Sequence, residues 1–166
     1  DVLKKYKRIK STPHHHPLRL NAPCPENLQE LVSPGGHPVV VLAQRQEISS
    51  GTKAFLPNKM YQPVLEYLKD NNYSIVFSGR ENFPIEWEKY GVIDYAKSDL
   101  ANVHNDFHLY RLARFGVLPN SGTCALAEAQ CMPYVQYNSS LIVVPPYSKN
   151  SILLPSVLTH GDSKKM

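Results

Sequence analysis

FGVLPNSGTCALAEAQCMPYVQYN, residues 115–138, begins with a short apolar run and breaks at Asn120-Ser121-Gly122-Thr123. The pattern then becomes helical and ends in a second apolar run after Pro133. This order predicts a strand, a helix and a strand. Strands joined through a helix pair in parallel, because a crossover connection is needed to bring them side by side. The stretch therefore predicts an α/β fold.

The same alternation recurs towards the N-terminus. Valine-rich HPVVVLAQR (37–45) is typical of a strand buried on both faces. The further expected elements are a helix in 59–72, strands in 73–80 and 91–96, and a helix over 105–116 with Asn105 or Asp106 as its N-cap. We therefore predict a Rossmann-like, mostly parallel sheet of four or five strands with helices on both faces.

The composition divides the chain into three segments. Residues 1–36 contain five prolines and a basic start, and only Glu26–Val32 has the pattern of a short helix, so we predict a Pro-rich basic arm or inter-domain linker. Residues 37–158 form the expected folded domain, and residues 159–166 a polar tail. A chain of 166 residues suits one domain.

Composition also bears on location and partners. The longest apolar runs, Val39–Ala43 and Leu141–Val144, are far below the roughly 20 residues of a membrane span. Three cysteines without paired metal spacing favour a reduced, cytoplasmic setting. The net charge of +4 comes largely from the first ten residues, which suit a solvated arm or a peripheral membrane contact. We expect no nucleic-acid partner.

Ligands of open parallel sheets bind beyond the carboxyl ends of the strands. In this sequence those ends carry small, polar or cationic residues. The sets are Gln44-Arg45-Gln46, Ser78-Gly79-Arg80, Asp94-Tyr95-Ala96, Asn120-Ser121-Gly122-Thr123 and Asn138-Ser139-Ser140. Because two of the sets carry an arginine, we expect a pocket that prefers an anion.

Ser121-Gly122-Thr123 is the strongest candidate within these sets. The first turn of a helix has unpaired N–H groups and partial positive charge, and glycine lets a phosphate approach the backbone. The alternative is that Ser121 or Thr123 only caps the helix.

Three further side chains suit the same ligand. Arg45 and Arg80 could bind a pyrophosphate with their forked donors, or each could form a surface ion pair. Glu128 lies seven residues beyond Ser121, about two helical turns along the same side. Its carboxylate could accept hydrogen bonds from ribose hydroxyls, or face solvent.

Other candidates are weaker. His14-His15-His16 lie in a Pro-rich arm, and His104 and His108, four residues apart, have no third ligand placed by spacing, so we predict no metal. Cys124 has no partner histidine fixed by the sequence and is interpreted as a buried thiol. The chain lacks both G-x-G-x-x-G and a Walker motif, so we expect no dinucleotide cofactor.

Taken together, these stretches resemble the C-terminal, sugar-nucleotide-binding half of GT-B glycosyltransferases, and in particular a bacterial group linked to surface-polysaccharide synthesis. The resemblance covers about residues 38–158. The matching stretches, in order, are VVVLAQR, YQPVLEYLKDNNYSIVFSGR, VIDYAKSD, NDFHLYRLARFGVLPNSGTCALAEAQCMPYVQYNSS and SILLPSVL.

The resemblance implies a role for each candidate. Ser121, Gly122 and Thr123 would meet the diphosphate of a nucleotide-diphosphate sugar, and Glu128 would hold its ribose. Arg45 and Arg80 would neutralise the leaving diphosphate, with Gly79 beside Arg80, and Asp94-Tyr95-Ala96 would lie beside the base. GT-B catalysis commonly needs no metal, since positive side chains and the helix terminus stabilise the leaving group.

Two departures qualify this implied function. GT-B enzymes have two Rossmann-like domains, and residues 1–36 cannot supply the second, which carries the acceptor and usually the catalytic base. A missing N-terminal domain or a partner subunit is therefore expected. The segment ISSGTKAFLPNK (48–59) also lacks the Arg-Asn pair associated with the group.

Three functions follow. The first is a glycosyltransferase donor domain, a fragment or one half of the active enzyme, that transfers a sugar to a glycan or other hydroxyl acceptor. The second is a non-catalytic interaction or glycan-binding module. The third is a sugar-nucleotide epimerase-like domain, which would also need a second domain.

Overall fold

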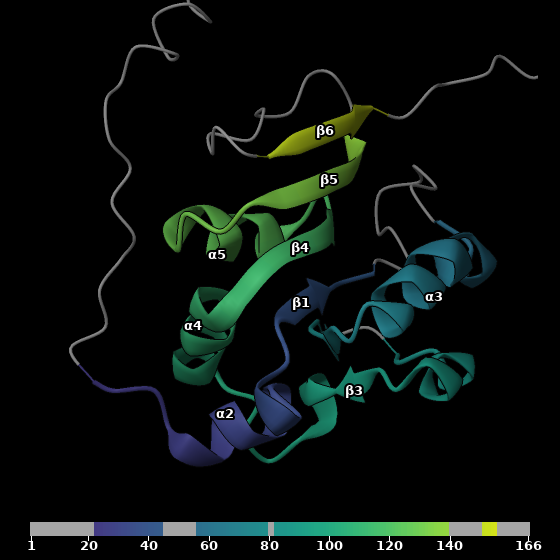
Figure 1. Cartoon of the computed structure of the whole chain (residues 1–166). Helices are drawn as coiled ribbons and strands as arrows, with labels where there is room; N and C mark the ends of the chain where they lie inside the picture. Colours follow the sequence, from purple (N-terminus) through teal and green to yellow (C-terminus); the bar gives the residue numbers. More distant parts are fainter. Residues whose placement is uncertain (1–21, 45–55, 80–81, 140–150, 156–166) are drawn as a thin grey trace, which may run out of the picture.

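The computed structural model describes residues 22–44, 56–79, 82–139 and 151–155 (Figure 1). Its centre is a sheet of six parallel strands in the order β3-β2-β1-β4-β5-β6. The strands are β1 (Val39–Leu42), β2 (Ser74–Phe77), β3 (Ile93–Asp94), β4 (Ala113–Pro119), β5 (Tyr134–Ser139) and β6 (Ile152–Pro155). The predicted Rossmann-like α/β class is confirmed, and the sheet has six strands where four or five were expected.

Four α-helices and four 3₁₀ turns surround the sheet within the described residues. The helices are α2 (Glu26–Val32), α3 (Gln62–Asp70), α4 (Val103–Leu112) and α5 (Gly122–Ala129). The turns are η1 (Pro34–Gly36), η2 (Asn58–Tyr61), η3 (Ile85–Tyr90) and η4 (Tyr95–Lys97). None of the described helices is both long and apolar enough to cross a membrane.

The strand order reverses between β1 and β4. From β1 the chain passes through α3 to β2 and through η3 to β3, and then returns through α4 to β4 on the other side of β1. The registers Leu42↔Phe77 and Leu42↔Val117 bring the carboxyl ends of β1, β2 and β4 to one edge of the sheet. Such a reversal is the point where α/β sheets bind ligands.

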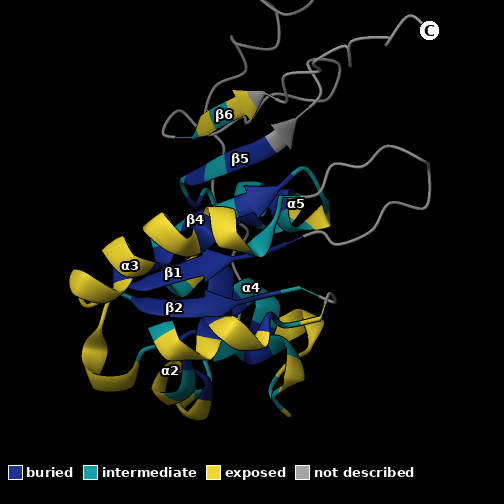
Figure 2. Cartoon of the chain, turned by 90° about the vertical axis from the view of Figure 1, so that its right-hand side faces the viewer, coloured by how far each residue is buried: buried dark blue, intermediate teal, exposed yellow. Residues whose placement is uncertain are grey.

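Burial on both faces explains the continuous apolar run of β1. Val39 and Val41 pack in a cluster with α2, α4 and α5, whereas Val40 and Leu42 pack in a second cluster with α3 and η3. We call these two sides the α5 face and the α3 face. Because successive side chains of a strand point to opposite faces, a strand covered on both sides has no polar position (Figure 2).

The helix predicted over 105–116 has different bounds. Helix α4 begins at Val103 and ends at Leu112, and its N-cap is Asn102, whose Oδ1 accepts a hydrogen bond from the Asn105 backbone N–H at 3.0 Å. The prediction of Asn105 or Asp106 as N-cap is therefore wrong. At the other end the chain enters β4, because pairing of Ala113 with Val39 replaces the helical pattern.

The short helix predicted over Glu26–Val32 is confirmed. Leu28 and Val32 are fully buried in the cluster of the α5 face, and the Ser74 hydroxyl donates a hydrogen bond to the Val32 carbonyl at 2.6 Å. Helix α2 lies within the segment expected to be an arm or linker, yet it packs against the sheet. Residues 1–21 and the predicted tail, 159–166, lie outside the described residues.

Candidate ligand pocket

A cavity of about 680 Å³ opens at the carboxyl edge of the sheet, where the strand order reverses. The ends of β1, β2 and β3 and the first turns of α4 and α5 line it. The lining residues are Ala43, Gln44, Ser78, Gly79, Tyr95, Ala96, Ala101, Asn102, Val103, Asp106, Ser121, Gly122, Thr123 and Leu126. Its size is within the range of small-molecule sites.

The first turn of α5 forms one wall. Ser121 is the N-cap, and its Oγ accepts a hydrogen bond from the Thr123 backbone N–H at 3.4 Å and shares another with the Thr123 hydroxyl at 2.8 Å. The proposed capping role of Ser121 is thus confirmed. The bond to the Thr123 N–H is long and correspondingly weak, so a stronger acceptor such as a phosphate oxygen could replace it.

Gly122 makes this turn approachable. A Cβ atom placed at Gly122 would meet nothing within 4 Å, and the residue is exposed at the pocket wall. Any side chain here would therefore extend into open space and occupy part of the route to the backbone. The anion-binding role of this turn stays a prediction.

The first turn of α4 forms a second wall, which the sequence did not predict. Its N-cap Asn102 and the half-buried Asp106 both line the pocket. The Asp106 carboxylate accepts a hydrogen bond from the Tyr95 hydroxyl at 2.9 Å. Burial, and then the Asp106 carboxylate, raise the pKa of Tyr95, so this hydroxyl remains a donor. Two helix N-termini therefore converge on one cavity that also holds a carboxylate.

A series of side-chain hydrogen bonds fixes Gln44, a lining residue of the pocket that is 3% exposed. Its Nε2 donates to the Leu56 carbonyl at 3.2 Å and to Asn58 Oδ1 at 2.6 Å, while Asn58 Nδ2 donates to Glu86 Oε1 at 2.6 Å. Since a carboxylate and a carbonyl can only accept, both amides have a fixed orientation. Gln44 thereby holds the chain at residues 56–58 against the end of β1.

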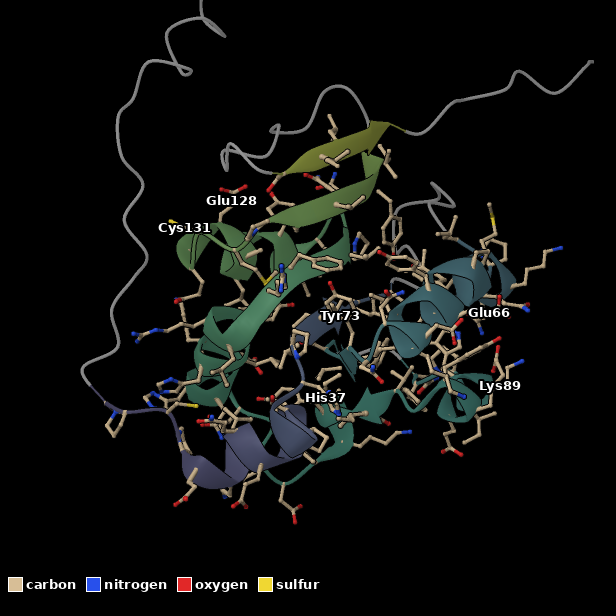
Figure 3. All side chains as sticks on the ribbon, viewed as in Figure 1. His37, Glu66, Tyr73, Lys89, Glu128 and Cys131 are labelled. Carbon is tan, nitrogen blue, oxygen red and sulfur yellow. The ribbon has the colours of Figure 1, made fainter. Side chains whose placement is uncertain are left out.

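Six of the nine predicted site residues line the pocket: Gly79, Tyr95, Ala96, Ser121, Gly122 and Thr123. Arg45 and Arg80 lie outside the described residues. Glu128 lies near the end of α5, beside Cys131 and β5, and is not among the lining residues (Figure 3). Its Oε1 accepts a hydrogen bond from the Tyr134 hydroxyl at 2.5 Å.

The reason for this placement of Glu128 is distance along the helix. Two helical turns return a side chain to the same side but move it by about 10 Å along the axis. The first turn of α5 faces the pocket, whereas its end faces β5. The carboxylate that does line the pocket is Asp106. Its position in the first turn of the helix before β4 is the sequence feature that could have identified it.

The weaker candidates have structural surroundings. The buried Cys124 thiol donates to the Pro119 carbonyl at 3.0 Å, and burial raises its pKa to about 11, which disfavours a thiolate nucleophile. His104 and His108 place their Nε2 atoms 3.3 Å apart, and burial lowers the pKa of His108. Over the described ranges, no three His, Cys, Asp or Glu side chains gather as a metal site would require. His14-His15-His16 lie outside those ranges.

No protein-family model matches the sequence, and no curated protein matches it. Among solved structures, the chain is similar to the iron-containing dodecameric glycosyltransferase TibC from enterotoxigenic E. coli H10407, with a TM-score of 0.55 and 20% sequence identity. The match covers 87% of this chain and 36% of TibC. At this identity the likeness shows the fold, and the chain spans about a third of that glycosyltransferase.

Proposed function

We propose that this chain is the donor-binding part of a glycosyltransferase and that its pocket binds a nucleotide-diphosphate sugar. The observation that carries the proposal is the convergence of the α4 and α5 N-termini on one cavity at the strand-order reversal. Partial positive charge at both termini suits a diphosphate. The likeness in fold to a glycosyltransferase supports the same assignment.

In this proposal the diphosphate lies against the first turn of α5. The Ser121 and Thr123 hydroxyls and the N–H groups around Gly122 donate to its oxygens. As an acceptor hydroxyl attacks the anomeric carbon, the bond to the diphosphate oxygen breaks and negative charge grows on the leaving group. Donors fixed in position before the reaction stabilise that charge most effectively, and we assign Arg45 and Arg80 to the same task.

Asp106 is the carboxylate that we assign to the donor hydroxyls, in place of Glu128. It lines the pocket, and a carboxylate repels phosphate but accepts hydrogen bonds from hydroxyl groups. Tyr95, Ala96 and Gly79 complete this side of the cavity. The pocket then has an anion-binding end at α5 and a hydroxyl-binding end at α4, which together match a phosphorylated sugar or ribose.

The acceptor and the catalytic base are assigned to a domain or subunit beyond these residues, as the length of TibC relative to the match suggests. The proposal therefore concerns donor binding first and transfer second. A module that binds the donor without transferring it would have the same pocket.

Calorimetric titration with UDP-, GDP-, ADP- and CMP-sugars tests the proposal. We expect one series to bind at millimolar affinity or better. Gly122→Val should abolish that binding without harming the fold, because the new side chain meets open space. Ala125→Val is the matched control, since it places the same side chain on an exposed position of α5 outside the pocket.

Arg80→Ala should weaken the same ligand. Failure of all four nucleotide series to bind the unaltered chain would overturn the donor-site proposal and favour the interaction module. Equal affinity of the Gly122→Val and Ala125→Val chains for the ligand would show that the ligand does not bind at the first turn of α5.

A further inference from the structure

A buried hydroxyl group lies beneath the pocket without a hydrogen bond. Tyr110, on α4, is fully buried in the cluster of the α5 face, and its hydroxyl has no hydrogen-bond partner among the described residues. An unpaired polar group in the interior is costly, and most buried polar groups in native proteins are paired. Packing accounts for the ring of Tyr110, whereas the hydroxyl needs a separate explanation.

The surroundings of this hydroxyl belong to the pocket. Tyr110 follows Asp106 by four residues, about one helical turn, so both side chains lie on the same side of α4. Burial raises the pKa of Tyr110, and the Ser78 and Thr123 side chains act against that rise, so both lie close to the phenol oxygen. Asp106, Ser78 and Thr123 all line the pocket. A protonated phenol, which can donate a hydrogen bond, is therefore held behind the first turn of α5.

The hydrogen bonds at this turn leave room for such a donor. The Ser121 and Thr123 hydroxyls share one hydrogen bond at 2.8 Å, so one of their two protons is used within the turn. Because diphosphate oxygens accept hydrogen bonds, both hydroxyls can donate to a diphosphate only when this mutual bond opens. The Thr123 oxygen can then accept from another donor.

We propose that Tyr110 is a positioning residue for the diphosphate: its hydroxyl donates to the Thr123 hydroxyl oxygen when the ligand binds, and Thr123 donates its own proton to the ligand. We call this series the hydroxyl relay. It rests on the proposed function, because that proposal assigns the diphosphate to the first turn of α5. Binding pairs a phenol that is unpaired in the free chain, so part of the affinity comes from Tyr110.

The first test compares Tyr110→Phe with Tyr134→Phe in the full chain, by thermal midpoint and by calorimetric titration with inorganic pyrophosphate and the four nucleotide-sugar series. Tyr134 is also buried, but its hydroxyl donates to Glu128 outside the pocket. Tyr110→Phe should keep the midpoint of the free chain and bind each ligand of the unaltered chain about two- to tenfold more weakly. Tyr134→Phe should lower the midpoint by about 2–5 °C and leave the affinity unchanged.

The outcomes distinguish the relay from the donor site itself. Where the unaltered chain binds, an unchanged affinity of Tyr110→Phe would overturn the relay and leave the donor site in place. A midpoint of Tyr110→Phe that falls as far as that of Tyr134→Phe would also overturn the relay, because the phenol would then be paired in the free chain. Failure of the unaltered chain to bind any of these ligands would overturn both proposals.

The second test identifies the acceptor of the Tyr110 hydroxyl. Thr123→Val removes the hydroxyl and keeps the branched shape of the side chain. The double variant Tyr110→Phe/Thr123→Val should bind no more weakly than Thr123→Val alone, because the phenol acts only through Thr123. Additive losses would overturn the relay, as would non-additivity of Tyr110→Phe with Ser78→Ala in place of Thr123→Val.

Discussion

Exchanging Asp106 for asparagine separates the structure-based assignment of the pocket carboxylate from the sequence-based one. Asparagine keeps the size of the side chain and an oxygen that can accept from Tyr95, but it removes the charge. Hydrogen bonds to charged groups contribute about 1.5–3 kcal/mol, so a hydroxyl that donates to Asp106 should bind about 10- to 150-fold more weakly. The measurement is a calorimetric titration with the nucleotide sugar or nucleoside diphosphate that binds the unaltered chain.

Two controls make this result specific. Inorganic pyrophosphate has no sugar hydroxyl, so its affinity should stay the same or rise as the repelling charge is removed. Glu128→Gln alters the carboxylate that contacts Tyr134 rather than the pocket, and it should leave the affinity for the nucleotide within about twofold. A large loss with Glu128→Gln and none with Asp106→Asn would refute the assignment and restore the role first predicted for Glu128.

Three further predictions concern the scaffold of the pocket. Gly116→Val should lower the free energy of unfolding by about 1–3 kcal/mol, measured by chemical denaturation, because a Cβ there would lie 2.8 Å from Met132 Cε and 3.2 Å from Leu118 Cγ; an unchanged midpoint would contradict it. Tyr137→Phe should cost about 1–2 kcal/mol in the same assay, since the buried Tyr137 hydroxyl donates to the Ala43 carbonyl at 2.9 Å and bonds Tyr61; Tyr67→Phe, on the exposed side of α3, should cost nothing measurable. Burial raises the pKa of Cys124 from 9.0 to about 11. The stability that this shift contributes is therefore present below pH 9 and is lost as the pH rises from 9 to 11, because the unfolded thiol loses its proton first. Cys124→Ala should flatten the dependence of the unfolding free energy on pH in this window, and iodoacetamide at neutral pH should leave Cys124 unmodified until the chain unfolds.

Much of the fold could be predicted because two patterns are strong in this sequence. The run at Val39–Leu42 has no polar position, which indicates a central strand, and the alternation of strand and helix fixes parallel pairing. Strand β6 was missed, since four residues without alternation of polar and apolar positions carry little signal. The bounds of α4 were also missed, because pairing with β1 decides where the chain leaves the helix.

The pocket was predictable only as far as the strand ends reveal it. The rule that ligands bind beyond the carboxyl ends of strands predicts from the sequence that Gly79, Tyr95, Ala96 and Ser121–Thr123 are neighbours, and all of them line the pocket. Asp106 escaped the same reasoning, because it belongs to a helix start rather than to a strand end. Only the return of the chain through α4 to β4 brings it into the same pocket as Ser121.

Donor binding and sugar transfer can be tested separately in this protein. All the residues that the proposal assigns to the donor belong to this chain, and those described come from the turn after β2, from η4, from α4 and from the start of α5. The carboxyl edge on which they meet is held by the parallel sheet and by the Gln44–Asn58–Glu86 hydrogen bonds, which need no second domain. An isolated chain should therefore bind the donor with its own pocket, even though the acceptor and the base are assigned elsewhere. Donor binding without sugar transfer would then assign the acceptor site and the base to a further domain or subunit. Absence of donor binding would remove the reason for expecting such a domain or subunit.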